Sequence, residues 1–349
     1  MDENKKPLTY LFPFDYSDGM VQIARQSGLG YADKSGELVI PCKYDTGYPF
    51  CEGLAYVVKG KYKAFIDKTG KEVINLQEYQ DADSFSEGMS GVKKDDKWGF
   101  IDKAGKVIIP FLYDEVNWFS EGLCTVFKGD KAGVIDKDGN ETIPFIYDDI
   151  IAFSEGIAEV AKDGKSGGID AQGNIVVPIQ YNSANECSEG LIVVDIDDKY
   201  GVMDKAGKKI VPLIYDDAAY KYSGGLLPVE KEGKWGVIDK EGKEIIPFRY
   251  DKMRLFREGL AAVCINKRWG FIDKDNNQVI PIQFKKAHNF SDGLVFVEGE
   301  ARRAYYLNGK GEAEIQLGRE YTIVEKVKAT IMVGAIIAFI ALLIAKFLG

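Results

Sequence analysis

The sequence is poor in the residues that build most metal centres and hydrolase active sites. Its 349 residues contain one histidine and five cysteines, and no Cys-x-x-Cys pair occurs. A single histidine excludes a multi-histidine metal centre, and a Ser-His-Asp mechanism would have to use His288 alone. The odd number of cysteines is typical of reduced, mostly buried thiols in a cytosolic compartment. We therefore expect a protein that is not an enzyme, with no catalytic residue, no metal and no cofactor.

Basic residues are also in the minority. The chain has 45 Lys and Arg against 54 Asp and Glu, a formal net charge of -9, which argues against a nucleic-acid partner. A hydrophobic fraction of 46% beside 28% charged residues is globular composition and excludes wholesale disorder.

Glycine, by contrast, is abundant, and much of it belongs to an internal repeat. Copies of the box Phe85-Ser86-Glu87-Gly88 recur along the chain at steps of 34 or 35 residues. Their terminal glycines occupy positions 19, 53, 88, 122, 156, 190, 225, 259 and 293. A fixed period of this length indicates nine structural units.

A second box keeps the same phase. Ile101-Asp102-Lys103 has counterparts in the other units, followed by a turn glycine or, once, Asn276. Seven of the nine units then contain an Ile-Pro or Val-Pro pair, and five contain an aromatic-acid pair such as Tyr113-Asp114. In three units a Trp-Gly pair precedes the second box: Trp98-Gly99, Trp235-Gly236 and Trp269-Gly270.

Within a unit the apolar residues alternate as in strands. Residues 123–127 and 133–136 read as two strands joined by a tight turn, and 147–153 can form another. No stretch before residue 315 has the length and period of an amphipathic helix. We expect an all-β fold of nine antiparallel meanders that stack on one another, because one meander cannot bury both of its faces.

The sequence leaves open whether the array closes. Four strands per unit suggest a propeller blade, but the unit is short beside the roughly 40 to 50 residues of typical blades, and nine exceeds the usual number. Tyr10 opens the first unit and Ile315 closes the ninth, so no strand is visibly held back to seal a ring. We expect either a propeller-like ring or an open curved solenoid.

The runs at 97–103, 234–240 and 268–274, preceded by Ser-Glu-Gly-Leu-like boxes and followed by Ile-Pro, resemble the WG-repeat family. The resemblance covers residues 8–317. It implies an all-β repeat domain that mediates interactions, and it transfers no catalytic residue. Units one, two and nine depart most from the pattern, as terminal capping units often do.

The aromatic and acidic side chains offer the candidate sites. Trp98, Trp235 and Trp269 could form a stacking surface for a sugar or peptide, but their repeated position favours the core between units, together with Gly99, Gly236 and Gly270. Trp118 lies outside that position, so we predict that it is exposed. The acidic turn at 136–141 lacks the spacing of an EF-hand and is interpreted as the turn of the repeat.

The C-terminal residues form an apolar run. Positions 329–345 carry no charge, and Phe347 and Leu348 extend the run past Lys346. At about 1.5 Å per residue this is near the lower bound for crossing a bilayer, so we predict a transmembrane helix over 329–348 after a charged linker at 318–328. Arg319, Lys326 and Lys328 precede the span, which by the positive-inside rule keeps the repeat domain cytoplasmic, on a single-pass protein of the cell membrane.

Small residues four apart in the span, Gly334 with Ala338 and Ala341 with Ala345, could allow weak homo-association. The leading hypothesis is a membrane-tethered, non-enzymatic scaffold that binds an unknown protein partner at the cytoplasmic face. The alternative is a sensor that binds a small molecule or glycan on the same array.

Overall fold

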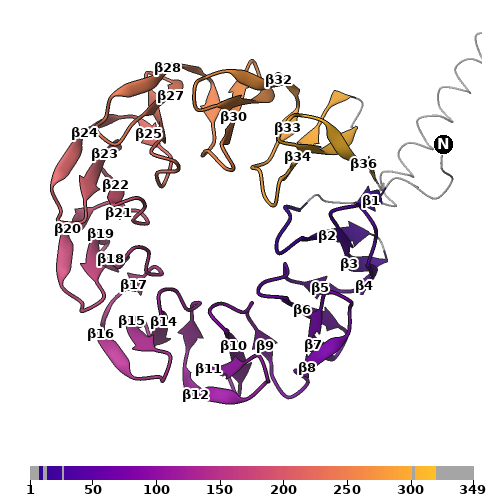
Figure 1. The fold of residues 1–349 in the computed structure, drawn as a ribbon. Coiled ribbons are helices and arrows are strands. Elements are labelled where there is room, and N and C mark those ends of the chain that lie inside the picture. Colours follow the sequence, from indigo (N-terminus) through magenta and orange to yellow (C-terminus); the bar gives the residue numbers. More distant parts are fainter. Residues whose placement is uncertain (1–7, 11–13, 26, 301–302, 320–349) are drawn as a thin grey trace, which may run out of the picture.

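The computed structural model describes residues 8–10, 14–25, 27–300 and 303–319. They form nine sheets arranged as the blades of a closed β-propeller, and the described part contains no α-helix (Figure 1). Nor does that part contain a helix long and apolar enough to cross a membrane. The predicted span at 329–348, with Gly334, Ala338, Ala341 and Ala345, lies outside the described residues, and the predicted linker begins inside the last strand.

Blades 2 to 9 each have four of their own strands, and blade 1 has three. The first, innermost strands are β5 (Thr46–Gly47), β9 (Asp81–Ala82), β13 (Glu115–Val116), β17 (Asp149–Ile150), β21 (Ser183–Ala184), β25 (Asp217–Ala218), β29 (Lys252–Met253) and β33 (Lys286–Ala287). The second strands are β2 (Met20–Arg25), β6 (Leu54–Lys59), β10 (Met89–Lys94), β14 (Leu123–Lys128), β18 (Ile157–Lys162), β22 (Leu191–Ile196), β26 (Leu227–Lys231), β30 (Leu260–Ile265) and β34 (Leu294–Glu298).

The remaining strands build the outer half of each blade. The third strands are β3 (Gly28–Asp33), β7 (Tyr62–Asp67), β11 (Lys97–Asp102), β15 (Lys131–Asp136), β19 (Lys165–Asp170), β23 (Lys199–Asp204), β27 (Lys234–Ile238), β31 (Arg268–Asp273) and β35 (Ala304–Asn308). The outermost strands are β4 (Ile40–Tyr44), β8 (Glu72–Asn75), β12 (Val107–Tyr113), β16 (Glu141–Tyr147), β20 (Ile175–Tyr181), β24 (Lys209–Tyr215), β28 (Glu244–Tyr250), β32 (Gln278–Phe284) and β36 (Ala313–Arg319).

The central hairpin of each blade follows from its turn residues. In blade 3, β10 pairs with β11 so that Lys94 lies opposite Lys97. The two residues between them, Asp95 and Asp96, have φ of 50° and 63°. Positive φ at both positions defines the two-residue turn whose twist matches an antiparallel pair, and aspartate tolerates this conformation better than most residues.

The glycine of the Trp-Gly pair is required by the outermost strand. In blade 3, Trp98 pairs with Tyr113 and Phe100 with Ile109, so three residues of β12 bulge opposite Gly99. A Cβ built on Gly99 would lie 2.6 Å from the Ile109 carbonyl oxygen. Only glycine allows the two backbones to come this close, and the proline inside the bulge needs no ladder hydrogen bond.

Blades 2 and 9 show the converse. They lack the glycine, carrying Ala64 and Tyr305 at its position, and their outermost strands contain no proline. In both, the third strand pairs with the fourth without a bulge at this point, as Tyr305 does with Gln316. The glycine, the proline and the bulge therefore occur together or not at all.

The core lies between neighbouring blades. At the junction of blades 3 and 4, Phe100 and Phe119 are both 1% exposed and meet edge to face, with ring centroids 5.0 Å apart. Ile135 of blade 4 belongs to the same cluster. Each box phenylalanine thus seals the interface to the preceding blade, as the prediction of stacked units requires.

The ring closes through a strand that the sequence analysis missed. β1 (Leu8–Tyr10) pairs in parallel with β36, so that Leu8 lies opposite Leu317 (Figure 1). The open solenoid is therefore wrong, and so is the expectation that no strand is held back. Three residues at the start of the chain supply the fifth strand of the ninth blade.

Blades 1 and 9 consequently pack as neighbours rather than as terminal caps. Tyr16 and Tyr306 are buried with ring centroids 5.0 Å apart. Ser291 Oγ donates a hydrogen bond of 2.7 Å to the Tyr16 carbonyl oxygen. The junction repeats a contact found elsewhere, since Ser86 Oγ donates to the Phe119 carbonyl at the same distance.

Candidate functional site

A ring of carboxylates joins the loops that follow the first strands. At the junction of blades 3 and 4, the Glu87 carboxylate accepts a 2.9 Å hydrogen bond from the Gly122 amide and lies 3.1 Å from Lys137 Nζ. Partial burial opposes ionisation of Glu87, but the bonds from Lys137 and Gly122 outweigh it and hold the pKa below the usual range. We call this arrangement the clasp.

A second set of carboxylates works at the opposite ends of the strands. Asp148, from a Tyr-Asp pair, follows β16 and lies 2.6 Å from Lys131 Nζ of its own blade. It also accepts a 2.7 Å hydrogen bond from the Asp163 amide in the hairpin turn of the next blade. Both repeated acids are therefore structural, and they rigidify the junctions between blades.

The inner loops also carry exposed apolar side chains. These loops face the centre of the ring (Figure 1). Trp118 is 56% exposed, Tyr220 45%, Ile151 43% and Tyr48 39%. Each stands in the segment between the first strand and the box turn of its blade, the turn that ends in the repeated glycine. A rigid ring that shows separate large apolar side chains around its centre has anchors of the kind that protein interfaces use.

The tryptophans of the Trp-Gly pairs occupy the borders of the core. Trp98, Trp235 and Trp269 are half-buried and pack against the clusters at the junctions with blades 4, 8 and 9. Gly99, Gly236 and Gly270 are buried under the bulges of the outermost strands, with backbone atoms within 3.0 Å of a Cβ built on each.

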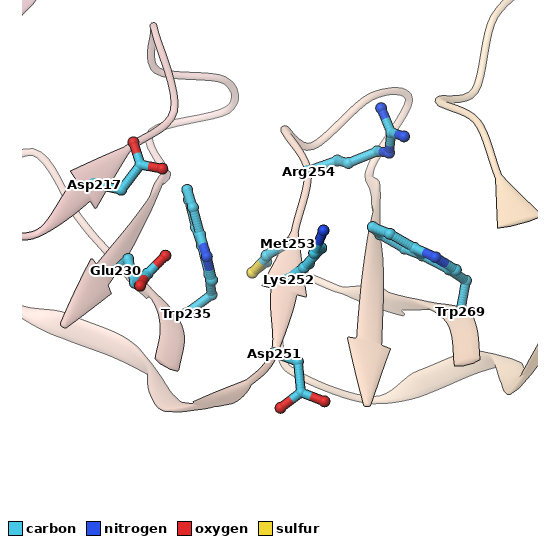
Figure 2. A pocket seen from close by; sticks show the side chains of 8 residues that line it. All are labelled: Asp217, Glu230, Trp235, Asp251, Lys252, Met253, Arg254 and Trp269. Carbon is cyan, nitrogen blue, oxygen red and sulfur yellow. The ribbon is translucent and has the colours of Figure 1, made fainter. Parts of the chain in front are cut away.

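Two of these tryptophans line a pocket of about 440 Å³ at the junction of blades 7 and 8. Figure 2 shows Trp235 standing between Asp217 and Glu230 on one side and Lys252 and Met253 on the other. The other residues that line the pocket are Asp251, Arg254 and Trp269. The Arg254 guanidinium lies 5.3 Å from the Trp269 ring centroid, within cation–π range. The pocket combines a flat aromatic wall with charges of both signs, which suits a polar planar or cyclic ligand.

Two titratable groups occupy matching positions on inner loops. Burial, followed by the charge of Asp81, raises the pKa of the Asp83 carboxyl to about 6. The counterpart in blade 9 is His288, whose Nδ1 lies 2.9 Å from a carboxylate oxygen of Asp15. Ser90 Oγ donates a 2.8 Å hydrogen bond to the Asp83 carbonyl oxygen, and burial, followed by the charge of Asp83, raises the pKa of the Cys124 thiol, so Asp83 activates neither group as a nucleophile. In the sequence, His288 stood out only as the single histidine that a Ser-His-Asp mechanism could use. Nothing in the sequence singled out Asp83, because its burial depends on the neighbouring blade.

The acidic turn at 136–141 is used by its own backbone. Asp136 Oδ1 accepts hydrogen bonds from the amides of Asp138, at 3.0 Å, and Asn140, at 2.8 Å. The turns that begin at Asp102 and Asp204 repeat this pattern. The carboxylate therefore organises the turn between the third and fourth strands.

The fold and the repeated boxes define a β-propeller built from WG units. The family model for the WG containing repeat matches eight segments: residues 30–62, 64–98, 98–131, 133–165, 167–200, 200–235, 235–269 and 269–298. The chain belongs to the WG-repeat family. No curated protein shows significant sequence similarity to it.

Solved structures resemble this chain in fold. A crystal structure of a eukaryotic initiation factor has a TM-score of 0.62 at 8% identity, covering 86% of this chain and 96% of the other. BamB from Moraxella catarrhalis gives 0.40 at 11% identity, with coverage of 75% and 93%. Hsv2p from Kluyveromyces lactis gives 0.41 at 11%, with 68% and 95%. Of these three, only the initiation factor has a TM-score above 0.5, and at 8% identity its likeness concerns the fold alone.

Proposed function

We propose that this protein is a non-enzymatic scaffold, tethered to the cell membrane by its C-terminal segment, that binds protein partners at the cytoplasmic face. The observation that carries the proposal is the set of exposed side chains on the inner loops, Tyr48, Trp118, Ile151 and Tyr220. A monomeric protein gains nothing in stability from leaving a tryptophan half in water, whereas an interface gains a large anchor.

The tether rests on the sequence. Seventeen uncharged residues at 329–345 suffice for a short membrane helix, and the basic residues before them orient the propeller to the cytoplasm. Recovery of the full-length chain in the soluble fraction after a carbonate wash would overturn the tether and leave the scaffold proposal intact.

Capture of partners from detergent extracts tests the scaffold. The full-length chain is compared with a Trp118→Ala, Tyr220→Ala variant and with a control, Ile214→Ala, that removes an equally exposed apolar residue from the outer strand β24. We expect the double variant to lose specific partners and the control to keep them. Equal capture by all three would contradict the proposed surface.

A second candidate function is a sensor for a small polar molecule or a glycan. It is favoured by the pocket at the junction of blades 7 and 8, where Trp235 faces acidic and basic side chains (Figure 2). Thermal stabilisation of the propeller by a member of a small-molecule panel, lost in Trp235→Ala and kept in the matched variant Trp98→Ala, would favour this function.

A further inference from the structure

The carboxylate of the clasp is present at every junction of the ring except one. At eight junctions a carboxylate accepts a hydrogen bond from the glycine amide of the next box. The acceptors are Asp18, Glu52, Glu87, Glu121, Glu155, Glu189, Glu258 and Asp292. At the junction of blades 7 and 8 the equivalent residue is Gly224, which has no carboxylate.

The donors at that junction are nevertheless retained. Lys274 stands 50 residues after Gly224, the same offset that separates Lys137 from Glu87 and Lys205 from Glu155. In the described part of the chain Lys274 has no ion pair, and the Gly259 amide has no hydrogen-bond acceptor. The two other incomplete clasps fail in the opposite sense, because they keep the carboxylate and replace the lysine by Ala171 and Gly309.

The surroundings add positive charge. Arg257 replaces the serine of the box, on the same loop as Gly259, and its guanidinium reaches back across the junction to the Tyr220 hydroxyl at 3.2 Å. Nearby acids are engaged elsewhere. Glu258 accepts from the Gly293 amide, and Asp273 uses its carboxylate for the amides of its own turn. The charge of Lys274 makes only the smallest of the contributions that act on the pKa of Asp273, and the two side chains form no salt bridge. Gly224, Gly259 and Lys274 are all exposed, so a ligand can reach them.

We propose that the junction of blades 7 and 8 binds a carboxylate side chain from an acidic segment of a protein partner, held by the Gly259 amide, Lys274 and Arg257. The site is complementary to a carboxylate because the equivalent glycine amide and lysine hold one in six other clasps. The proposal deepens the scaffold function on which it rests, since it names the chemistry of the partner. Charge-assisted bonds to a backbone amide and an ammonium are the strong kind for such recognition.

The test measures binding of a fluorescein-labelled Glu-Gly-Glu-Gly peptide to the purified full-length chain in detergent, by fluorescence anisotropy. Its matched control is the peptide with glutamine in place of glutamate. We expect binding of the acidic peptide only, weakened by salt. Lys274→Gln should weaken it about tenfold, the usual value of one charge-assisted bond.

Gly224→Glu is the decisive variant. Residue 224 has a φ of 62°, close to the 50° to 54° of the glutamates at the same position in other blades, so the backbone accepts glutamate there. The new carboxylate should complete the clasp, raise the thermal midpoint and abolish peptide binding. Lys137→Gln, at a complete clasp, removes the same charge and should leave peptide binding unchanged.

Peptide binding that survives Gly224→Glu, or that is equal for the glutamine peptide, would overturn the proposal. A third result would also overturn it: the protein binds inorganic phosphate but not the acidic peptide, and Gly224→Glu abolishes the phosphate binding. Far-ultraviolet circular dichroism shows whether each variant folds. Because the peptide assay uses purified protein, its failure is distinguishable from failure of the scaffold, which partner capture measures separately.

Discussion

Blade 3 and blade 9 are copies of one unit that solve the problem of the outer edge differently. In blade 3 a proline bulge in β12 removes ladder hydrogen bonds from the edge, and Gly99 makes room for it. In blade 9 the outermost strand is straight opposite Tyr305, and its free edge pairs with β1. A bulged edge discourages further strands and a straight edge can accept one. Blade 2 also lacks the bulge but has only its own four strands, so the straight edge of blade 9 permits the closing strand without being sufficient to recruit it.

The largest effect that this comparison predicts is for Gly99→Val. The added Cβ meets a backbone carbonyl at 2.6 Å, so the bulge must move, and we expect a loss of about 3 kcal/mol or more in the free energy of unfolding. Chemical denaturation measures it. Tyr305→Ala in blade 9, where a Cβ is already present, should cost about 1 kcal/mol. Equal losses would mean that the bulge is not what requires glycine.

The next effect concerns pH and the matching residues Asp83 and His288. The folded pKa of Asp83, about 6, lies above the ordinary value of 3.8 for an aspartate, so the native state binds more protons between these values. Stability should therefore fall as pH rises from 4 to beyond 6, by about 2 kcal/mol after allowing for partial exposure. Denaturation of Asp83→Asn across this range should lack that fall, while His288→Asn should retain it.

Below about pH 4 the clasps reverse this trend. The folded pKa values of Glu52, Glu87 and Glu155 are lowered, so the stability that they contribute is present above their unfolded pKa and is lost as pH falls through the folded value. Maximum stability is therefore expected at about pH 4, where the two trends meet. A continuous rise in stability down to pH 2 would contradict the role assigned to the clasps.

A smaller effect is expected when the closing strand is removed. Deletion of residues 1–10 exposes the edge of β36 and should cost about 1 kcal/mol, because three paired residues are lost while the packing of Tyr16 on Tyr306 remains. Calorimetry compares this variant with one that lacks residues 1–7 and therefore keeps all three residues of β1. The difference in stability between the two measures the contribution of the pairing. If the shorter deletion is equally destabilised, the pairing of β1 is not responsible.

The smallest effect is predicted for Pro110→Ala in blade 3. The residue lies inside the bulge, between the paired positions Ile109 and Tyr113, so its missing amide donor is not needed by β11. The change in unfolding free energy should stay within about 0.5 kcal/mol. A loss as large as that of Gly99→Val would show that proline itself maintains the bulge.

The repeating β-meander could be predicted from the sequence because its turns and strands depend on residues that are close together in the chain. The turn residues, the alternation of apolar positions and the period of the boxes predict meanders, and the family match confirms the WG repeat. Closure was not predictable, since β1 is three residues long and its partner lies some three hundred residues away in the chain. Parallel pairing of such a short segment leaves no periodic pattern.

The candidate site was only partly visible in the sequence. The box at Tyr222-Ser223-Gly224-Gly225 stands out as a weak copy, but the importance of Gly224 depends on Lys274, which belongs to another box in the following blade. The contact between boxes one blade apart becomes apparent only when Glu87 is seen beside Lys137. The pocket beside Trp235 likewise needs two blades to exist.

Closure of the ring also distributes equivalent residues evenly around one surface of the molecule. Because the nine blades complete a circle, one repeat position occurs nine times at regular intervals around the ring. Asp83, Arg254 and His288, for example, occupy the same repeat position on the inner loops of three different blades. A substitution at this position in one blade changes the surface of that blade and leaves the equivalent positions of the other eight blades unchanged. Under the proposed scaffold function, the inner loops of different blades can therefore bind partners of different chemistry, and each loop can change in sequence independently of the others.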